Sequence, residues 1–244
     1  MTPNGWRKLW NWHLWLGLGL LLPLLWWMGT AVVFALWPIE EVRGRTFSTG
    51  QKAPAGALRS GMGVPPELLE GARAVTLRNV EGHPVAIVER DPKALLWDME
   101  ARQPLGECIP LPWAQAAAQR DYRGSFALEA VYFYPHQGPG QRASGSGPLV
   151  QPLPSEYTGP LPVYAFHLQR GSRMHLYVDA LSGEVRARRT RVWRFYDWCF
   201  RLHSLEIVGD GTKRILTLAI CALWFGLGST GLFMAWRRLR KSPR

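Results

Sequence analysis

Histidine is the residue type in this chain best suited to chemistry, because imidazole binds metals and exchanges protons near neutral pH. Two of the six histidines, His167 and His175, lie in strand-like segments joined by the turn at 170–172. If paired residues have numbers that sum to 342, one face of this hairpin is wholly apolar, and the other places His167 opposite His175. Two opposed imidazoles could bind copper or zinc, although two ligands rarely complete such a site. A solvent-facing cross-strand pair is the alternative.

The other histidines are scattered along the chain. His13 stands at the start of an uncharged apolar run, and His203 lies in the aromatic stretch 192–205, VWRFYDWCFRLHSL. This stretch predicts an interfacial helix, with a lid or collar over a cofactor as a further option. His83 and His136 are isolated, and we expect them in surface loops.

No set of catalytic residues can be nominated from the sequence. The chain has no nucleotide-binding, hydrolase or zinc-protease motif and no arguable pair of carboxylates or of nucleophile and base. Asp91, Asp98 and Asp179 each stand beside a turn, where a carboxylate can accept hydrogen bonds from backbone N–H groups. We therefore expect structural roles for all three.

Two apolar segments, Leu14–Trp37 and Ile215–Trp236, are long enough to span a membrane. The first has 24 residues, which as a helix extend roughly 36 Å. It ends at Pro38 without a small-residue cleavage site, so we expect an uncleaved span rather than a signal peptide. Eleven of the 13 tryptophans lie in or beside these segments, as the preference of tryptophan for the membrane–water interface predicts.

The net charge of +11 indicates membrane topology rather than nucleic-acid binding. Seven basic and no acidic residues lie in the two tails outside the spans, whereas all 18 acidic residues lie between them. The positive-inside rule places both termini in the cytoplasm and residues 38 to about 212 outside it. The central domain therefore has no access to cytosolic nucleotides, and we expect no nucleic-acid partner.

Small residues in the second span could bring helices close together in the bilayer. Ala219, Ala222, Gly226 and Thr230 share one face at helical spacing. This face could pack on the first span of the same chain, or on another membrane subunit or a second copy. Both alternatives remain open.

The three cysteines, Cys108, Cys199 and Cys221, form no disulfide pattern. We expect Cys108 and Cys199 to be unpaired thiols, with a bond between them as the alternative.

The region between the spans contains two similar stretches, Thr76–Glu107 and Pro162–Arg189. Each reads as a strand, a turn, a strand ending in Asp98 or Asp179, a four-residue turn and another strand. Gly183 supplies the positive φ that such a turn often requires. The first stretch departs from this pattern because it has Arg102 at the same place.

Further elements surround these stretches. Pro112–Asp121 predicts a short helix, and Leu128–Tyr134 predicts a strand. Leu58–Pro66 and Pro135–Pro162 are rich in Gly, Pro and Ser. The run GPGQRASGSG within the second of these predicts a flexible surface loop.

A helix followed by an antiparallel sheet that closes on VDALSGEV resembles the PepSY domain, and the flanking segments resemble the PepSY-associated transmembrane family. The motifs are His13 before LWLGL, Leu202-His203 with Gly209-Asp210-Gly211 before the second span, and Thr230-Gly231-Leu232 near its end. The resemblance covers both ends and residues 110–236, with a weaker echo in 67–108. It implies an α+β extracytoplasmic domain, a short helix on an antiparallel sheet with two degenerate repeats as an option, flanked by two transmembrane helices.

These observations together predict a division of the chain into seven parts. They are a cytoplasmic tail (1–13), the first transmembrane helix (14–37), a β-rich first half (38–109), a PepSY-like domain (110–191), an interfacial aromatic helix and loop (192–211), the second transmembrane helix (212–236) and a basic cytoplasmic tail (237–244). We expect the protein in the bacterial cytoplasmic, or inner, membrane.

The resemblance also suggests two functions. Isolated PepSY domains are binding or inhibitory modules, which implies an extracytoplasmic binding or assembly subunit, our first expectation. Larger relatives with four spans include ferric-siderophore reductases that carry haem on membrane histidines, which implies electron transfer through haem b at His13 and His203. These two histidines lie at opposite membrane faces, roughly 30 Å apart, so each would need a second histidine from another chain. Interfacial histidines bonded to headgroups or backbone are the alternative.

Overall fold

The computed structural model describes residues 3–56, 62–90, 93–169 and 173–241. The chain forms two compact units, one made of residues 1–38 with 195–244, and the other made of residues 39–194. The expected turn at 170–172 lies outside the described residues, and so do residues 58–61 of the Leu58–Pro66 stretch.

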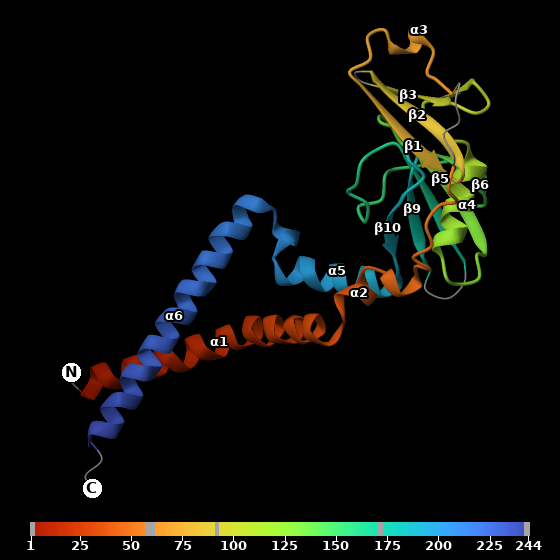
Figure 1. Ribbon diagram of the computed structural model, residues 1–244. Coiled ribbons are helices and arrows are strands. Elements are labelled where there is room, and N and C mark those ends of the chain that lie inside the picture. Colours follow the sequence, from red (N-terminus) through yellow and green to blue (C-terminus); the bar gives the residue numbers. More distant parts are fainter. Residues whose placement is uncertain (1–2, 57–61, 91–92, 170–172, 242–244) are drawn as a thin grey trace. The chain divides into compact units, whose positions relative to one another are not determined.

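The first unit contains the two long helices, α1 (Pro3–Leu36) and α6 (Asp210–Lys241). Both are long and apolar enough to cross a membrane. They contact one another and cross in Figure 1. The first predicted span, 14–37, covers the C-terminal part of α1 and continues one residue beyond it, and the second, 212–236, lies within α6. Both helices also include basic residues of the tails.

Side chains with reduced exposure recur along α1 at alternating spacings of three and four residues, which forms a seam on one face of the helix. This spacing is typical of helices that pack at a shallow left-handed angle. A matching seam runs along α6, where Trp224, Leu227 and Gly231 face α1. The residues of the α1 seam are Leu9, His13, Leu16, Leu20, Pro23, Trp27, Thr30, Phe34 and Trp37.

Helix α5 (Arg191–His203) packs against the C-terminal part of α1 through aromatic rings and is followed by the short 3₁₀ helix η2 (Glu206–Val208). Phe34 lies with its ring centroid 4.9 Å from that of Tyr196, and Trp37 lies 6.0 Å from Phe195. The prediction of a helix in the aromatic stretch is therefore confirmed.

The second unit contains two antiparallel sheets and short helices. The four-stranded sheet is a meander in the order β1-β2-β3-β4, and the six-stranded sheet has the order β10-β9-β8-β5-β6-β7 (Figure 1). The strands are β1 (Ala74–Val80), β2 (His83–Arg90), β3 (Lys93–Asp98), β4 (Gln103–Gly106), β5 (Leu128–Tyr134), β6 (Gly140–Gly145), β7 (Val150–Gln151), β8 (Val163–Leu168), β9 (His175–Asp179) and β10 (Val185–Arg189). The helices are α2 (Ile39–Val42), η1 (Arg45–Phe47), α3 (Pro66–Leu69) and α4 (Leu111–Asp121).

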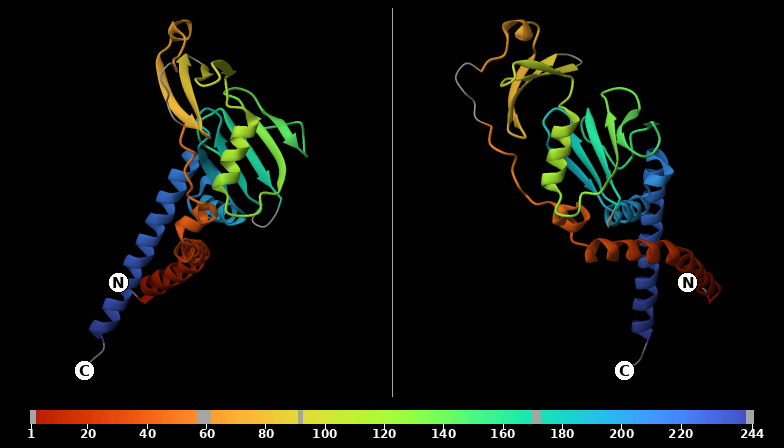
Figure 2. Two further views of the ribbon diagram at one scale, coloured as in Figure 1. Left: turned by 45° about the vertical axis from the view of Figure 1, so that its right-hand side comes forward. Right: turned by 90° about the vertical axis from the view of Figure 1, so that its right-hand side faces the viewer.

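One apolar core joins both sheets through α4. This helix contacts β8, β9 and β10 (Figure 2), and its alanines Ala114, Ala117 and Ala118 are fully buried. The meander adds Val85 and Leu96 to the same core. The small alanine side chains let the helix approach the sheet closely. Because helices pack on antiparallel sheets in this unit, the predicted α+β class is confirmed.

The expected hairpin register is present. Strands β8 and β9 pair His167 with His175, Phe166 with Leu176 and Tyr164 with Val178, and the apolar face lies in the core. The short helix and the strand Leu128–Tyr134 also form as predicted.

The aspartate turns expected at Asp98 and Asp179 form, whereas Asp91 lies outside the described residues. Asp98 Oδ1 accepts hydrogen bonds from the N–H groups of Glu100 and Ala101, both at 2.9 Å. Asp179 Oδ1 does the same with the next turn, at 2.8 and 3.0 Å. Gly183 has φ of 72°, and Arg102 adopts 52° at the equivalent position. The same kind of aspartate turn therefore joins β3 to β4 and β9 to β10, even where the sequence departs from the glycine pattern.

The expectation of a flexible loop at GPGQRASGSG is wrong. Residues 140–145 form β6, which pairs with β5. A Cβ at Gly140 would lie 2.2 Å from the Tyr134 ring, and one at Gly145 would lie 2.2 Å from Glu129 O. The glycines are therefore required for close packing of a strand, although their composition is also typical of a linker.

Candidate functional site

The two histidines of the membrane unit are each held by a threonine of another helix. His13 on α1 has Nδ1 2.9 Å from Thr230 Oγ1 on α6. At the end of α5, His203 has Nδ1 2.7 Å from Thr30 Oγ1 on α1. Thr30 is almost fully buried. Each helix, α1 and α6, therefore contributes one threonine to a His–Thr pair.

Each threonine also bonds to its own helix. Thr30 Oγ1 lies 3.1 and 3.0 Å from the carbonyls of Trp26 and Trp27. Thr230 Oγ1 lies 2.9 and 3.0 Å from those of Gly226 and Leu227. A hydroxyl has one hydrogen and two lone pairs. When it donates to a carbonyl of the preceding turn, it can only accept from the imidazole.

This network favours one arrangement of the histidine proton. When each hydroxyl donates to its helix carbonyl, the Nδ1–H of His13 donates to Thr230 and the Nδ1–H of His203 donates to Thr30, which leaves Nε2 of each ring without a partner among the described residues. Within the described residues neither Nε2 has a hydrogen-bond partner. A neutral imidazole with its second nitrogen held by a hydrogen bond is the usual form of a metal-ligating histidine.

The two His–Thr pairs lie at different levels of the membrane unit. His13 and Thr30 are 17 residues apart on α1, which corresponds to about 26 Å along the helix. His203 lies beside Thr30, so the two imidazoles cannot ligate one iron. The expectation of two separate levels agrees with this geometry.

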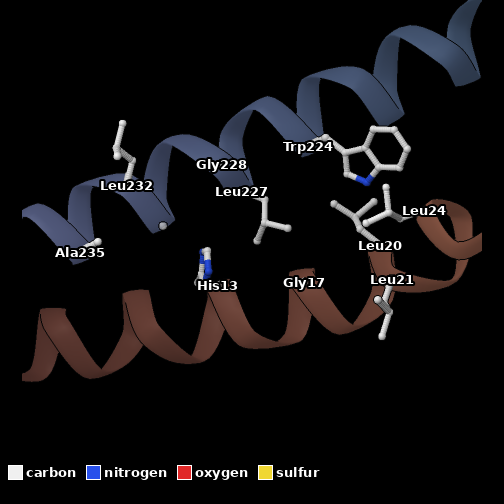
Figure 3. A pocket seen from close by; sticks show the side chains of 11 residues that line it. His13, Gly17, Leu20, Leu21, Leu24, Trp224, Leu227, Gly228, Leu232 and Ala235 are labelled. Atoms are coloured by element: carbon white, nitrogen blue, oxygen red, sulfur yellow. The ribbon is translucent and has the colours of Figure 1, made fainter. Parts of the chain in front are cut away.

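A groove of about 740 Å³ adjoins His13 between α1 and α6 (Figure 3). Its volume falls within the range typical of ligand and cofactor sites. Leucine is the most frequent residue type in its lining, and at Gly17, Gly228 and Gly231 the wall is formed by backbone without side chains. A Cβ at Gly231 would lie 3.1 Å from the His13 ring, so this glycine is needed for the imidazole to enter between the helices.

Aromatic rings connect the two levels. The Trp27 ring lies 6.0 Å from His203 and 4.8 Å from Trp224, measured between centroids. Trp224 in turn lines the groove beside His13. The described side chains therefore form a continuous aromatic connection from His203 to that groove.

The predicted small-residue face of α6 divides between two surroundings. Thr230 faces α1 through His13, whereas Ala219, Ala222 and Gly226 are exposed in the isolated chain. No atom of another segment lies within 4 Å of a Cβ built on Gly226. This part of the face is free for lipid or for another subunit, and that expectation stays a prediction.

The histidine pair of the soluble unit is covered rather than exposed to solvent. The rings of His167 and His175 stack with centroids 3.8 Å apart. A loop places Tyr157 on Tyr177, with centroids 4.6 Å apart, and Glu156 Oε1 lies 2.5 Å from His175 Nδ1. The solvent-facing alternative is therefore wrong, because residues between β7 and β8 fold over this face.

Glu156 is the centre of a charged network. It accepts hydrogen bonds from Tyr177 Oη at 2.8 Å and from Arg194 Nε at 2.7 Å. Burial alone would raise the pKa of Glu156, but hydrogen bonds from His175 and Arg194 outweigh it and lower the pKa to about 2. Burial and the neighbouring His175 lower the pKa of His167 to about 4.

This arrangement offers little to a metal ion. No group of three or more His, Cys, Asp or Glu side chains that could hold a metal occurs among the described residues. His175 Nδ1 already contacts Glu156, which leaves His167 Nε2, buried without a hydrogen-bond partner, as the remaining nitrogen of interest. Copper or zinc binding at His167 and His175 stays a prediction from the sequence.

The expectations for the two isolated histidines and for the cysteines have different outcomes. His136 is exposed in a loop, but His83 begins β2 and stacks on Trp113 of α4, with centroids 4.0 Å apart. The surface-loop expectation for His83 is therefore wrong. All three cysteines are free, as expected.

A comparison with family models adds independent information. The model described as the PepSY-associated TM region matches residues 10–244, which include both His–Thr pairs and the soluble unit. The chain belongs to the PepSY-associated transmembrane family. No curated protein and no solved structure matches it. As a PepSY-associated transmembrane protein, it is a membrane protein with two transmembrane helices and a PepSY-like domain between them.

Sequence reasoning missed several residues of this PepSY-associated transmembrane protein. Thr30 could have been found, because His13 and Thr30 share the three-and-four spacing of the α1 seam. The same spacing places Trp27 on the seam, although a tryptophan in an apolar segment also fits the membrane–water interface. Glu156 gave no signal, because it lies in a loop that approaches His175 only through the tertiary fold.

Proposed function

We propose that this protein is a membrane electron-transfer subunit that binds haem b through His13 and His203 with matching histidines of another chain. The observation that supports the proposal is the pair of His–Thr hydrogen bonds at Nδ1, which leave Nε2 of both histidines without a partner among the described residues.

The surroundings of His13 fit a tetrapyrrole. The groove is apolar and roomy, and its glycines would let a flat macrocycle approach the backbone. Haem held by two imidazoles would supply a one-electron centre whose potential depends on its ligands and burial. The chain itself would orient the imidazoles through Thr30 and Thr230, and exclude water with leucine side chains.

A second chain is required by the ligand count. Among the described residues each level offers one histidine, and the two levels are about 26 Å apart. The exposed residues Ala219, Ala222 and Gly226 provide a surface on which α6 of a second copy could pack closely. We therefore propose a homodimer in which each level holds two histidines, with a different membrane subunit as the alternative.

The direction of electron transfer and the electron acceptor are proposed from the membrane topology and from the family resemblance. Basic tails at both ends favour cytoplasmic termini in a bacterial inner membrane, with the soluble unit outside. Ferric-siderophore reductases are among the proteins that the family resembles, so we propose electron delivery to a ferric complex on the outer side, in iron uptake.

Single-histidine variants test the ligand assignment. The full chain is purified in mild detergent from haem-replete cells, and its visible spectrum is compared with those of His13→Ala and His203→Ala. We expect each variant to lose about half of the Soret absorbance per chain, because each removes the ligands of one level. The matched control, His136→Ala, changes an exposed loop histidine and should keep the full spectrum. Equal spectra in all three variants would refute the assignment.

A second candidate function is an extracytoplasmic binding or assembly subunit without cofactor. The observation that favours it is the soluble unit, which has its own core joining two sheets. Under this hypothesis the His–Thr pairs only hold α1, α5 and α6 together. A colourless protein from haem-replete cells, with intact helix content, would favour this candidate over electron transfer.

A further inference from the structure

The soluble unit contains a polar groove of about 490 Å³ that no described function uses. It lies where the segment 51–53, the β1–β2 turn, the end of α4 and the β9–β10 turn meet. Its volume is in the range of small-molecule sites.

The segment beside the groove is fastened to both neighbouring elements. Thr49 Oγ1 donates to the carbonyl of Arg120 at 2.6 Å, and Thr49 N–H donates to that of Asp121 at 2.7 Å. Asn79 Nδ2 on β1 donates to the carbonyl of Pro54. The groove is therefore formed before any ligand binds, which lowers the entropy cost of binding.

All three acidic side chains at the groove already have partners. Glu81 pairs with Arg120. Both oxygens of Asp121 are occupied by Arg188, and Oδ1 also accepts from Ser48 at 2.8 Å. Glu184 is likewise shared, with Arg186 at 3.0 Å and Arg78 at 3.5 Å. The carboxylates therefore offer little capacity to bind a cation.

Among the four basic side chains at the groove, Arg120 and Lys52 keep a donor that has no partner in the described part of the chain. Arg120 has a side chain that is only 20 % exposed, and its Nε is buried without a hydrogen-bond partner. A buried donor that lacks a partner costs about 1–3 kcal/mol. Lys52 lines the same groove, and within the described part of the chain it has no ion-pair partner.

We propose that this groove binds a small anion through carboxylate or phosphate groups, with Arg120 and Lys52 as its cationic contacts. Unused donors, occupied acceptors and an excess of one positive charge among the lining residues all favour an anion. The guanidinium supplies directed N–H donors, and the lysine supplies a mobile charge at the rim. The proposal is independent of any haem in the membrane unit.

The test measures anion binding to the full chain in mild detergent by calorimetry. Citrate and inorganic phosphate are titrated separately, each against sodium chloride at equal ionic strength, so that the two arms distinguish carboxylate from phosphate. We expect saturable binding of at least one of them. Lys52→Gln should weaken that binding roughly tenfold, as the loss of one charge-assisted hydrogen bond predicts.

The matched control is Arg73→Gln, which removes an exposed positive charge away from the groove and should bind as the unmodified chain does. Arg120→Gln should abolish binding; if this variant fails to fold, Lys52→Gln alone decides. The proposal is overturned if neither anion binds saturably, or if Lys52→Gln and Arg73→Gln have equal affinities.

Discussion

Thr30 and Thr230 each bond with a single hydroxyl to their own helix and to a histidine from another element. In lipid a polar side chain needs an internal partner, because no water is present to satisfy it. The hydroxyl cannot donate in two directions at once, so the bond to the helix carbonyl makes it an acceptor for the imidazole. The threonines thereby control which nitrogen of His13 and His203 is available.

Thr30→Val and Thr230→Val should each weaken haem binding about tenfold or more, because partners that orient a ligating histidine typically contribute 10- to 100-fold to affinity. Haem titration of the apo-protein measures this. Thr30→Ser and Thr230→Ser keep the hydroxyl and should restore binding. Thr217→Val is the control, because Thr217 lies on α6 like Thr230 and has no histidine partner among the described residues. If it weakens binding as strongly, the threonine assignment is wrong.

His167 makes the stability of the soluble unit depend on pH. Its pKa is lowered from 6.5 to about 4, so the folded state favours the neutral ring. The folded state then binds fewer protons than the unfolded state between these pH values, and stability rises with pH. The contribution of neutral His167 to the stability of the folded unit is fully present above about pH 6.5 and is lost as the pH falls towards 4.

We expect the free energy of unfolding to fall by about 1–2 kcal/mol between pH 7 and 5, and this fall should be much smaller in His167→Gln. Thermal unfolding of the full chain at a series of pH values measures it. His136→Gln, in an exposed loop, should retain the dependence of the unmodified chain. A pH dependence that is equal in both variants would contradict the role of His167.

At the level of elements, β3–β4 and β9–β10 are joined by the same kind of aspartate turn, but the turn at Asp179 contains more hydrogen bonds than the turn at Asp98. Asp179 Oδ2 also accepts hydrogen bonds from the Arg186 guanidinium at 3.0 and 2.8 Å. In the turn at Asp98, backbone N–H groups donate the hydrogen bonds to the carboxylate. Both carboxylates are buried. Their removal would leave backbone N–H groups without partners, which is costly in a buried turn.

Asp179→Ala should therefore lower the free energy of unfolding by about 2–3 kcal/mol, and Asp98→Ala by about 1–2 kcal/mol. Asp179→Asn keeps an acceptor for the turn and loses the ion pair, so it should lie between the unmodified chain and Asp179→Ala. Chemical unfolding measures all three. An equal loss in both alanine variants would show that the Arg186 contact adds nothing.

Some elements could be predicted from the sequence because local and global preferences agree there. The β8–β9 register follows from apolar alternation, which only one pairing preserves. Other elements depend on tertiary contacts. Strand β6 has linker-like composition, His83 needs Trp113 as a partner, and the histidine face is covered by a distant loop. At the candidate site the histidines were predicted, but their hydroxyl partners required the helix packing.

At the scale of the whole molecule, the number of histidines at each level makes an assembly part of the proposed function. The face made of Ala219, Ala222 and Gly226 is exposed, and no described atom of another segment lies within 4 Å of a Cβ built on Gly226. A bulky residue there leaves the intrachain seam intact but keeps a second α6 at a distance.

Gly226→Leu should therefore convert the dimer to a monomer and lose haem together with the dimer. Sedimentation in detergent measures the mass, and the visible spectrum measures the haem. Phe225→Leu changes an exposed residue next to it and should affect neither. If Gly226→Leu becomes monomeric and keeps its haem, one chain alone is sufficient and the shared-ligand account is wrong.

The most direct measurement is the ratio of haem to chain in the unmodified protein, purified in mild detergent from haem-replete cells. Because each chain has two ligating histidines and each haem requires two, the account predicts one haem b per chain. The Soret band should shift on reduction, as expected for iron held by imidazoles. A colourless protein with intact helices would contradict the account.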